Sequence, residues 1–251
     1  MVAVCHLAGG ASVPASIGNP YGDFSSLLPG TARLALFVAK YFPEAKFFLF
    51  SSAAIYGNPT SLPIKESSDP VPVSPYGIHK FLAETLLVHY KRLYGLNIRI
   101  LRIFSVYGPG LRKQLLWDIY QKCADSEKSG NDNITLFGTG LESRDFIYIV
   151  DLCRAVFSMI KDNDTQNLDI VNIASGVEST IKTVAENFVS HLGFKGSVQF
   201  NGIEATGNPV NWHADVTKLK QLSFKHDFGL NEGLEQVAGW TKTLVDKNPY
   251  S

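Results

Sequence analysis

Tyr76 and Lys80 are the residues whose types and spacing most clearly suggest chemistry. They stand four residues apart in a segment that is predicted to be helical, so both side chains project from one helix face. A Tyr hydroxyl ordinarily has a pKa of about 10, and a fixed ammonium nearby favours its ionised form. Lowering that pKa toward ~7 requires about 4 kcal/mol of differential stabilisation. Such a pair can serve as acid and base near neutral pH.

A second hydroxyl is expected beside this pair. Ser51 and Ser52 follow a short apolar segment, residues 46–50, which is predicted to be a buried strand. Ligand-facing groups in α/β sheets lie at the carboxyl ends of strands, where a hydroxyl can bond the same substrate oxygen as the tyrosine. Taken alone, Tyr-x-x-x-Lys also fits a half-buried Tyr beside a Lys whose stem covers apolar surface. The surrounding sequence has to separate these two interpretations.

The elements that would position these residues alternate between strand and helix. Apolar segments predict strands at 2–7, 46–50, 97–103 and 168–173, and helical spacing predicts helices at 24–42, 76–94 and 151–160. Pro29 is expected to kink the first helix or reset its start, and Asp151 is expected to cap the third. This order is typical of a parallel sheet with helices on both faces. The sequence therefore predicts an α/β fold.

The rest of the chain predicts a smaller mixed α/β region. The polar segment 125–133 is expected to be an exposed loop, and the stretch 58–75 contains too many prolines for a helix. Asn231 is expected to cap the last helix. The helices are expected near 115–127, at 181–192 and at 231–244, and the strands at 134–137, 145–149 and 197–200.

The bulk composition excludes several classes of function. The 251 residues carry 23 basic and 23 acidic side chains, which does not fit a basic nucleic-acid-binding protein. No apolar stretch approaches the ~20 residues needed to span a bilayer, and the N-terminus does not read as a signal peptide. The three cysteines and six histidines lack metal-ligand spacing, so no metal site is expected. Reduced cysteines fit a cytoplasmic protein.

Several long motifs, in order, carry a family resemblance. They are His-Leu-Ala-Gly at 6–9, Ser-Ser-Ala-Ala-Ile-Tyr-Gly at 51–57, Ser-Pro-Tyr-Gly-Ile-His-Lys at 74–80, Leu-Arg-Ile-Phe-Ser-Val-Tyr-Gly-Pro-Gly at 101–110, Gly-Thr-Gly at 138–140 and Arg-Asp-Phe-Ile-Tyr-Ile-Val-Asp at 144–151. Over nearly its whole length, the chain resembles the extended short-chain dehydrogenase/reductases that act on nucleotide sugars. The resemblance implies a Rossmann-like sheet, NAD or NADP as cofactor, and a nucleotide-diphosphate sugar as substrate.

The resemblance also implies roles for individual residues. Tyr76 would be the acid and base, Lys80 its partner and a ribose ligand, and Ser52 the second hydroxyl. A nearby Lys together with the positively charged nicotinamide would supply the stabilisation that the tyrosinate requires. The implied cofactor contacts are Ala8, Gly9, Ser51, Tyr76 and Lys80, and the implied substrate contacts are Ser105, Arg144 and Tyr148.

Two of the implied substrate contacts have structural alternatives. Arg144 suits a diphosphate because its planar fork can pair with phosphate oxygens, but it could instead form a surface ion pair with Asp145 or Glu142. Tyr148 could flank the base or be a core aromatic on a strand. His79 lies inside the Tyr-x-x-x-Lys motif and is expected to point away from the reactive face of the helix.

The two residues after Ser52 bear on the reaction. The sugar 4,6-dehydratases of this family carry Asp and Glu there, whereas this sequence has Ala53 and Ala54. The resemblance therefore favours an isomerase similar to the UDP-glucose 4-epimerases, which act at sugar C4 through transient oxidation by NAD(P). The close alternative is an NAD(P)-dependent 4-ketosugar reductase. In either case the family implies a cytoplasmic enzyme of polysaccharide biosynthesis.

The start of the chain departs from the family pattern. Family members open with a strand, a Gly-x-x-Gly-x-x-Gly turn and a helix that bind the cofactor pyrophosphate, and Met1 falls where the fourth strand of the family begins. The expected fold is therefore N-terminally truncated. Residues 1–105 with 145–173 would form the remainder of the dinucleotide-binding domain, and 106–144 with 174–251 the substrate-binding region.

Two further expectations concern partners. Because the Gly-rich turn is missing, the second functional hypothesis is a truncated, catalytically inactive binding or assembly partner. The family also implies a homodimer, formed through the helix at 76–94 and the helix before it. The apolar stripe along 82–93 permits such pairing.

Overall fold

The main layer of the fold is a four-stranded parallel sheet. The computed structural model describes residues 1–161, 169–203, 210–222 and 224–245. The strands pair in the order β1-β2-β3-β7, and their bounds are Ala3–His6 for β1, Lys46–Ser52 for β2, Asn97–Ile103 for β3 and Ile170–Ile173 for β7. All four strands were predicted from the sequence, and the α/β fold class is confirmed.

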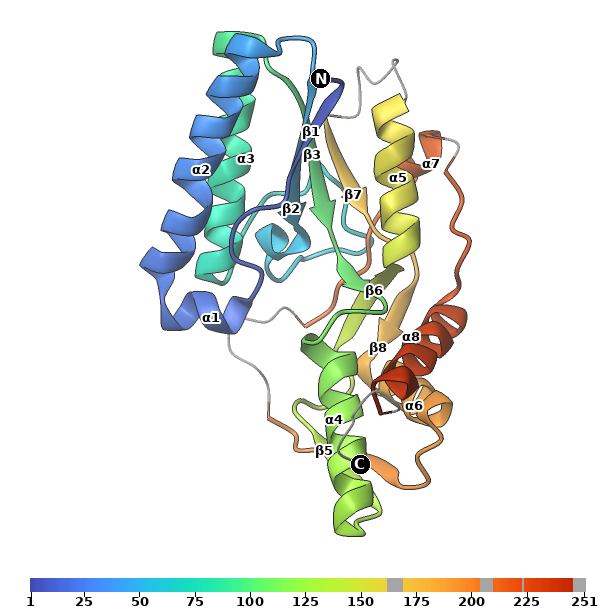
Figure 1. The fold of residues 1–251 in the computed structure, drawn as a ribbon. Coiled ribbons are helices and arrows are strands. Elements are labelled where there is room, and N and C mark those ends of the chain that lie inside the picture. Colours follow the sequence, from blue (N-terminus) through green and yellow to red (C-terminus); the bar gives the residue numbers. More distant parts are fainter. Residues whose placement is uncertain (162–168, 204–209, 223, 246–251) are drawn as a thin grey trace.

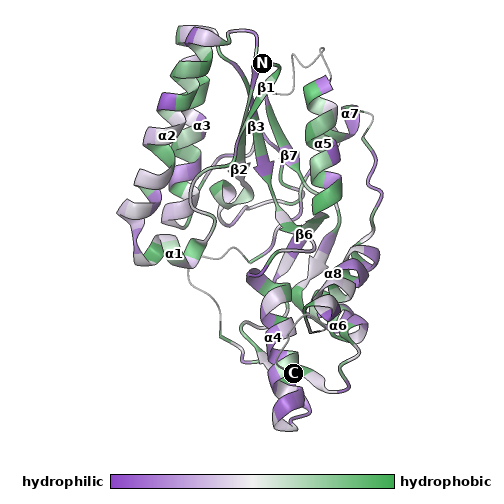
Figure 2. Ribbon diagram, viewed as in Figure 1, coloured by the Kyte–Doolittle hydropathy of each residue, from purple (hydrophilic) through white to green (hydrophobic). Residues whose placement is uncertain are grey.

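Helices cover both faces of this sheet. α2 (Pro20–Tyr41) and α3 (Pro75–Tyr94) lie side by side on one face, and α5 (Ile149–Lys161) lies on the other (Figure 1). The side chains of β2 alternate between these layers, because Phe47 packs with residues of α2 and α3 whereas Phe48 packs with residues of α5. This is the two-residue period of a strand buried on both faces. The strands accordingly are among the most hydrophobic segments of the ribbon (Figure 2).

A second region extends from the carboxyl ends of these strands. Its sheet has the strand order β4-β6-β8, and β5 pairs separately with β9. The helices α4, α6 and α8 surround these strands (Figure 1). The bounds are Ser105–Tyr107 for β4, Asn133–Leu136 for β5, Ser143–Tyr148 for β6, Glu178–Thr180 for β8, Ser197–Phe200 for β9, Gln114–Ser129 for α4, Ile181–Leu192 for α6 and Leu230–Val245 for α8.

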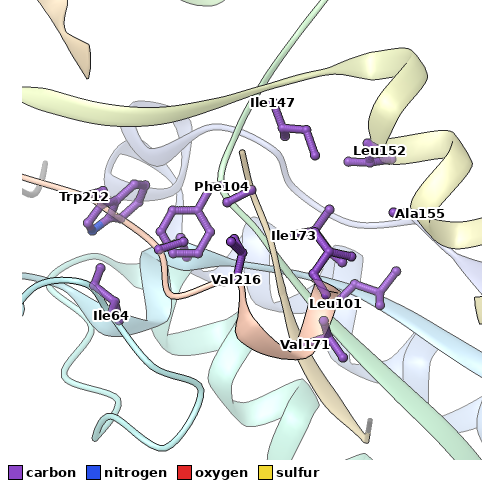
Figure 3. Packing of buried hydrophobic residues seen from close by; sticks show 14 of the residues in the cluster. Ile64, Leu101, Phe104, Ile147, Leu152, Ala155, Val171, Ile173, Trp212 and Val216 are labelled. Carbon is purple, nitrogen blue, oxygen red and sulfur yellow. The ribbon is translucent and has the colours of Figure 1, made fainter. Parts of the chain in front are cut away.

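A late segment of the chain returns to the main sheet and joins the two regions. Trp212 and Val216 pack in the same cluster as Leu101 of β3 and Phe104 (Figure 3). The ring of Trp212 meets that of Phe104 edge to face, at 6.0 Å between centroids. The helix α7 (Thr217–Gln221) follows directly. Residues after 174, which were assigned to the substrate-binding region, therefore also pack against the main sheet.

Pro29 does not reset the start of helix α2, which was one of the two outcomes expected for it. The helix starts at Pro20 and runs to Tyr41 with Pro29 inside it, although proline removes one backbone hydrogen bond from a helix interior. Burial of the helix face that includes Leu27 and Thr31 holds the segment in place despite that loss. The short elements α1 (Val13–Gly18), β4, α7 and β8, of three to six residues, were not predicted.

Three local expectations are wrong for related reasons. Asp151 and Asn231 lie inside α5 and α8 rather than at their N-caps. The Asp151 carboxylate instead accepts hydrogen bonds from the backbone amides of Asp227 and Phe228, a long-range contact. The segment 125–133 is not an open loop, because α4 continues to Ser129. Its Ser126 is buried and donates to a carbonyl in the following turn.

Two absences hold for the described part of the chain. None of its helices is both long and apolar enough to cross a membrane. None of its His, Cys, Asp and Glu residues gather in a group of three that would hold a metal ion.

Candidate active site

Tyr76 and Lys80 lie on the first turns of α3, where local sequence fixes the helix start. Ser74 is the N-cap, and its hydroxyl accepts the backbone N–H of Gly77 at 3.2 Å, while Pro75 occupies the first helical position, which tolerates its missing N–H. The Lys80 ammonium lies 5.8 Å from the centre of the Tyr76 ring. Its Nζ donates to the carbonyl oxygen of Phe50 at 2.8 Å. The two side chains therefore share one helix face, which points at the end of β2.

Ser52 ends β2 and faces the same space. Its hydroxyl accepts the backbone N–H of Ala54 at 3.2 Å and so caps the short 3₁₀ helix η1 (Ala53–Tyr56). Burial raises the pKa of the Tyr76 hydroxyl above its ordinary value, while a hydrogen bond with Ser52 lowers it and the charge of Asp23 raises it. Ser52 and Tyr76 thus form the hydroxyl pair that the sequence predicted.

The pKa of Tyr76 does not follow from its spacing to Lys80 alone. The spacing alone suggests a lowered pKa, but the net direction is upward because burial dominates. Lys80 is itself desolvated, and burial lowers the pKa of its ammonium to about 8 while Asp23 and Glu84 raise it. The protein alone therefore holds Tyr76 protonated, ready to donate a hydrogen bond to a substrate oxygen.

A cavity of about 910 Å³ opens in front of this pair and reaches into the second region. This volume lies in the range of small-molecule and cofactor sites. Ser52, Tyr76 and Lys80 line one part of the wall, and Ser105 and Arg144 line another. A single cavity therefore connects the reactive residues with a polar and cationic group from β4 and β6.

Arg144 is held along this cavity rather than at a surface ion pair. Its Nη1 donates to the carbonyls of Ser143 at 2.7 Å and Val210 at 3.1 Å, and its guanidinium stacks on the ring of Trp212 at 5.3 Å. Burial lowers the pKa of Arg144 to about 10. The carboxylate of Asp145 is instead bonded to backbone amides and a hydroxyl. Arg144 therefore lines the cavity without a carboxylate partner among the described ion pairs.

Tyr148 packs as a core aromatic, which is the structural alternative considered for it from the sequence. It is buried in the core of the second region, where its ring lies 4.5 Å from that of Phe228 and 5.6 Å from that of Tyr107. It is not among the residues that line the cavity. The two-residue period of β6 places Tyr148 on the same face as Arg144 and Phe146, which do line the cavity. Tyr148 differs from them because the rings of Tyr107 and Phe228 pack against it.

The remaining predicted cofactor contacts differ in their relation to the cavity. Ala8 and Gly9 follow β1, but the wall of the cavity there is made by Leu7 and Gly10. Ser51 lines the cavity, and its hydroxyl donates to the carboxylate of Glu84. The interaction between Ser51 and Glu84 was not anticipated from the sequence.

Two ionisable pairs beside the reactive residues also escaped the sequence interpretation. His79 points toward α2, where its Nδ1 lies 2.6 Å from the carboxylate of Asp23, and Asp23 raises the pKa values of both Tyr76 and Lys80. Glu84 pairs with Arg102 of β3. The spacing of four residues from Lys80 to Glu84 is a usable signal, because it places both on one helix face.

Comparison with known proteins agrees with this geometry. A family model described as "NAD dependent epimerase/dehydratase family" matches residues 1–174. The chain is 32% identical over 246 residues to a UDP-glucuronate 4-epimerase of Thermodesulfobacterium geofontis, a match covering 97% of this chain and 73% of the relative.

Solved structures of 4-epimerases are also similar to the chain. The UDP-glucose 4-epimerase of Thermotoga maritima with UDP-glucose superimposes with a TM-score of 0.86 at 27% identity, covering 97% of this chain and 78% of that one. The UDP-glucuronic acid 4-epimerase of Bacillus cereus, in complex with UDP-glucuronic acid and NAD, gives 0.85 at 26% identity and covers 97% and 76%.

Proposed function

The chain belongs to the NAD dependent epimerase/dehydratase family, and we propose that it is an NAD(P)-dependent nucleotide-sugar epimerase acting at sugar C4. The observation that carries the proposal is the convergence of the Ser52 and Tyr76 hydroxyls, with the Lys80 ammonium, on one cavity. The 4-epimerases among its relatives and structural neighbours support the same reaction.

Tyr76 is the proposed acid and base. As the tyrosinate, which the cationic nicotinamide of a bound cofactor would favour, Tyr76 would take the proton from the C4 hydroxyl of the sugar as that carbon is oxidised, and would later return it to the keto oxygen after the sugar has turned in the cavity. Ser52 donates a hydrogen bond to the same oxygen and holds it near Tyr76. Because Tyr76 gives back the proton that it took, the epimerisation needs no proton from solvent.

The cofactor proposed for this site is NAD or NADP, which supplies the acceptor and the source of the hydride when bound. The residues present fit its nicotinamide ribose. One of the three N–H donors of Lys80 goes to Phe50, and because Lys80 lines the cavity, its other donors suit ribose hydroxyls. The cation of the oxidised ring would also favour the tyrosinate of Tyr76, against the effect of burial. The 251 residues contain no Gly-x-x-Gly-x-x-Gly turn, so no residue is proposed for the pyrophosphate.

The substrate proposed is a nucleoside-diphosphate sugar. Arg144 is oriented by two carbonyls and by the Trp212 ring, and its remaining guanidinium donors suit diphosphate oxygens. Ser105, which lines the same cavity, is the second proposed contact. Tyr148 is not proposed as a contact, because it packs in the core.

The two residues after Ser52 argue against a dehydratase. Ala53 and Ala54 pack in the core cluster, and Ala54 also lines the cavity. Neither side chain carries a carboxylate that could exchange a proton with the sugar. The proposed chemistry therefore stops at oxidation and reduction of C4.

The test is conversion of UDP-glucose, UDP-glucuronic acid or UDP-N-acetylglucosamine to the C4 epimer with NAD present, followed by proton NMR. Tyr76→Phe is expected to abolish conversion, and Tyr94→Phe, an exposed tyrosine on the same helix, to leave it unchanged. Turnover of Tyr76→Phe at the wild-type rate would refute the assigned role. Reduction of a 4-ketosugar by NADPH without epimerisation would favour the reductase.

Calorimetric titration separates an enzyme from an inactive assembly partner. The proposal expects saturable binding of NAD or NADP, and of a UDP-sugar, by the 251-residue protein. Absence of both, together with absence of turnover, would favour the inactive partner.

We also propose a homodimer through α2 and α3, in a cytoplasmic protein of polysaccharide biosynthesis. Exposed apolar side chains on these helices, such as Phe37, Tyr41 and Leu82, support the pairing. Leu82→Arg is expected to give a monomer by light scattering. Phe157→Arg, at an exposed position on α5, is the matched control and should leave the dimer intact.

A further inference from the structure

Glu84 continues the line of Tyr76 and Lys80 along α3. It lies four residues beyond Lys80, and only 2% of it is exposed. Its carboxylate accepts the hydroxyl of Ser51 and two bonds from Arg102, at 3.2 Å from Nε and 2.8 Å from Nη2. The three reactive or ionisable side chains of α3 thus face the end of β2 together.

Arg102 carries the connection further into the sheet. Its Nη1 donates to the hydroxyl of Tyr56 at 3.0 Å and to the carbonyl of Glu66 at 2.8 Å. The Tyr56 hydroxyl in turn donates to Asn172 of β7 at 2.7 Å. The polar network therefore links α3, the ends of β2, β3 and β7, and the loop after β2. The side chains of Tyr56, Glu84, Arg102 and Asn172 are all buried.

Stability alone does not account for this network. A buried ion pair costs much of its attraction in lost hydration, and apolar residues of the same size are often as stable or more stable. Its position suggests another role. Three successive residues of β2 make a bond to α3: the Phe50 carbonyl accepts Lys80, the Ser51 hydroxyl donates to Glu84, and Ser52 meets Tyr76.

We propose that Glu84 is a positioning residue for the Ser52–Tyr76 hydroxyl pair, because it joins the Ser51 hydroxyl to the Arg102 guanidinium and so fixes α3 against the carboxyl end of β2. The inference rests on the function proposed above. Glu84 does not line the cavity, so it acts through Ser51 and not on the substrate. The charge of Glu84 also raises the pKa of Lys80, which keeps the ammonium protonated in the aligned state.

Ser51→Ala tests the inference with little disturbance to the fold, because Glu84 keeps its pairing with Arg102. Ser126→Ala is the matched control, since Ser126 is also buried and bonded by its hydroxyl, but in α4. Ser51→Thr restores the hydroxyl. Two quantities are measured in all variants: kcat and KM for 4-epimerisation, and the titration of Tyr76 without ligands, followed by NMR of ring-labelled tyrosine and identified with Tyr76→Phe.

In Ser51→Ala, kcat is expected to fall by about 10- to 100-fold with little change in KM, since misplaced reacting groups slow the chemical step. Tyr76 is expected to titrate at higher pH, because a loosened Ser52 no longer lowers its pKa, while Asp23 and Lys80 still face it. Ser51→Thr should recover both, and Ser126→Ala should change neither despite a similar loss of stability.

The inference is overturned if Ser51→Ala matches Ser126→Ala in both kcat and the Tyr76 titration. A fall in kcat with an unchanged titration also overturns it, because that would place Ser51 on the cofactor instead. If the wild type shows no turnover, the proposed function fails, and the Tyr76 titration in Ser51→Ala still decides the positioning role.

Discussion

Replacing Lys80 with methionine should separate stability from activity. Lys80 is 4% exposed, and burial lowers the pKa of its ammonium from 10.5 to about 8. The two pKa values differ by about 2.5, and a difference of one corresponds to about 1.4 kcal/mol. Burying the charged ammonium therefore costs the folded state about 3 kcal/mol at pH 7. Met has a similar length and no charge, so Lys80→Met removes this cost and loses the bond to Phe50, worth about 1 kcal/mol. We expect a net stabilisation of about 2 kcal/mol.

The direction of the pH dependence follows from the same two pKa values. Below pH 8 the ammonium is charged in both the folded and the unfolded chain, and the full cost applies. Between about 8 and 10.5 the unfolded chain binds the proton more strongly than the folded one, so the wild type gains stability as pH rises. Lys80→Met lacks this gain, and its advantage should therefore disappear as pH approaches 10.5.

Urea unfolding at pH 7 and pH 10, followed by tryptophan fluorescence, measures both effects. Lys128→Met, at an exposed position on α4, is the control and should leave the free energy of unfolding within about 0.5 kcal/mol of the wild type. Turnover of Lys80→Met should fall at least about 100-fold by loss of the proton-transfer partner. A Lys80→Met protein less stable than the wild type at pH 7, with a gap independent of pH, would refute the reasoning.

Three further substitutions give sharp expectations. Arg144→Met should weaken UDP-sugar binding at least about tenfold in calorimetry through loss of charge-assisted bonds, and unchanged affinity would remove Arg144 from the proposed site. Glu84→Ala should lower the free energy of unfolding by about 3–5 kcal/mol in urea, because Arg102 is left buried without its carboxylate; a loss below 1 kcal/mol would contradict this. Gly57→Ala should cost about 3 kcal/mol in thermal unfolding, since φ is 57° and a Cβ would lie 1.9 Å from the Val71 carbonyl oxygen; an unchanged melting temperature would show that the turn relaxes.

The long elements could be predicted because their patterns extend over many residues. α3 begins within one residue of its expected start, since Ser74, Pro75 and the final Gly95 are strong helix boundary signals. The pairing of Ser52 with Tyr76 was also predictable, because strand ends and helix starts meet at one edge of a parallel sheet.

The parts that failed depend on contacts between distant residues. Asp151 has the composition of a cap, but its partners are amides 76 and 77 residues away. The partner of Glu84 lies on β3, and nothing in the helical spacing of α3 identifies Arg102. Tyr148 was ambiguous because it shares a strand face with the cavity-lining Arg144 and Phe146, and only the tertiary structure shows that the rings of Tyr107 and Phe228 cover it.

The two kinds of buried carboxylate in this fold separate structural from functional roles. Asp145 and Asp151 accept backbone amides from remote segments, so each satisfies donors that would otherwise be buried without partners, and holds a loop. Glu84 accepts hydrogen bonds only from the side chains of Ser51 and Arg102. It therefore satisfies no backbone donor. An apolar residue at 84 with one at 102 would serve stability as well. A charged pair at this point is explained by the requirement for directed hydrogen bonds beside Ser52 and Tyr76, which apolar packing does not provide.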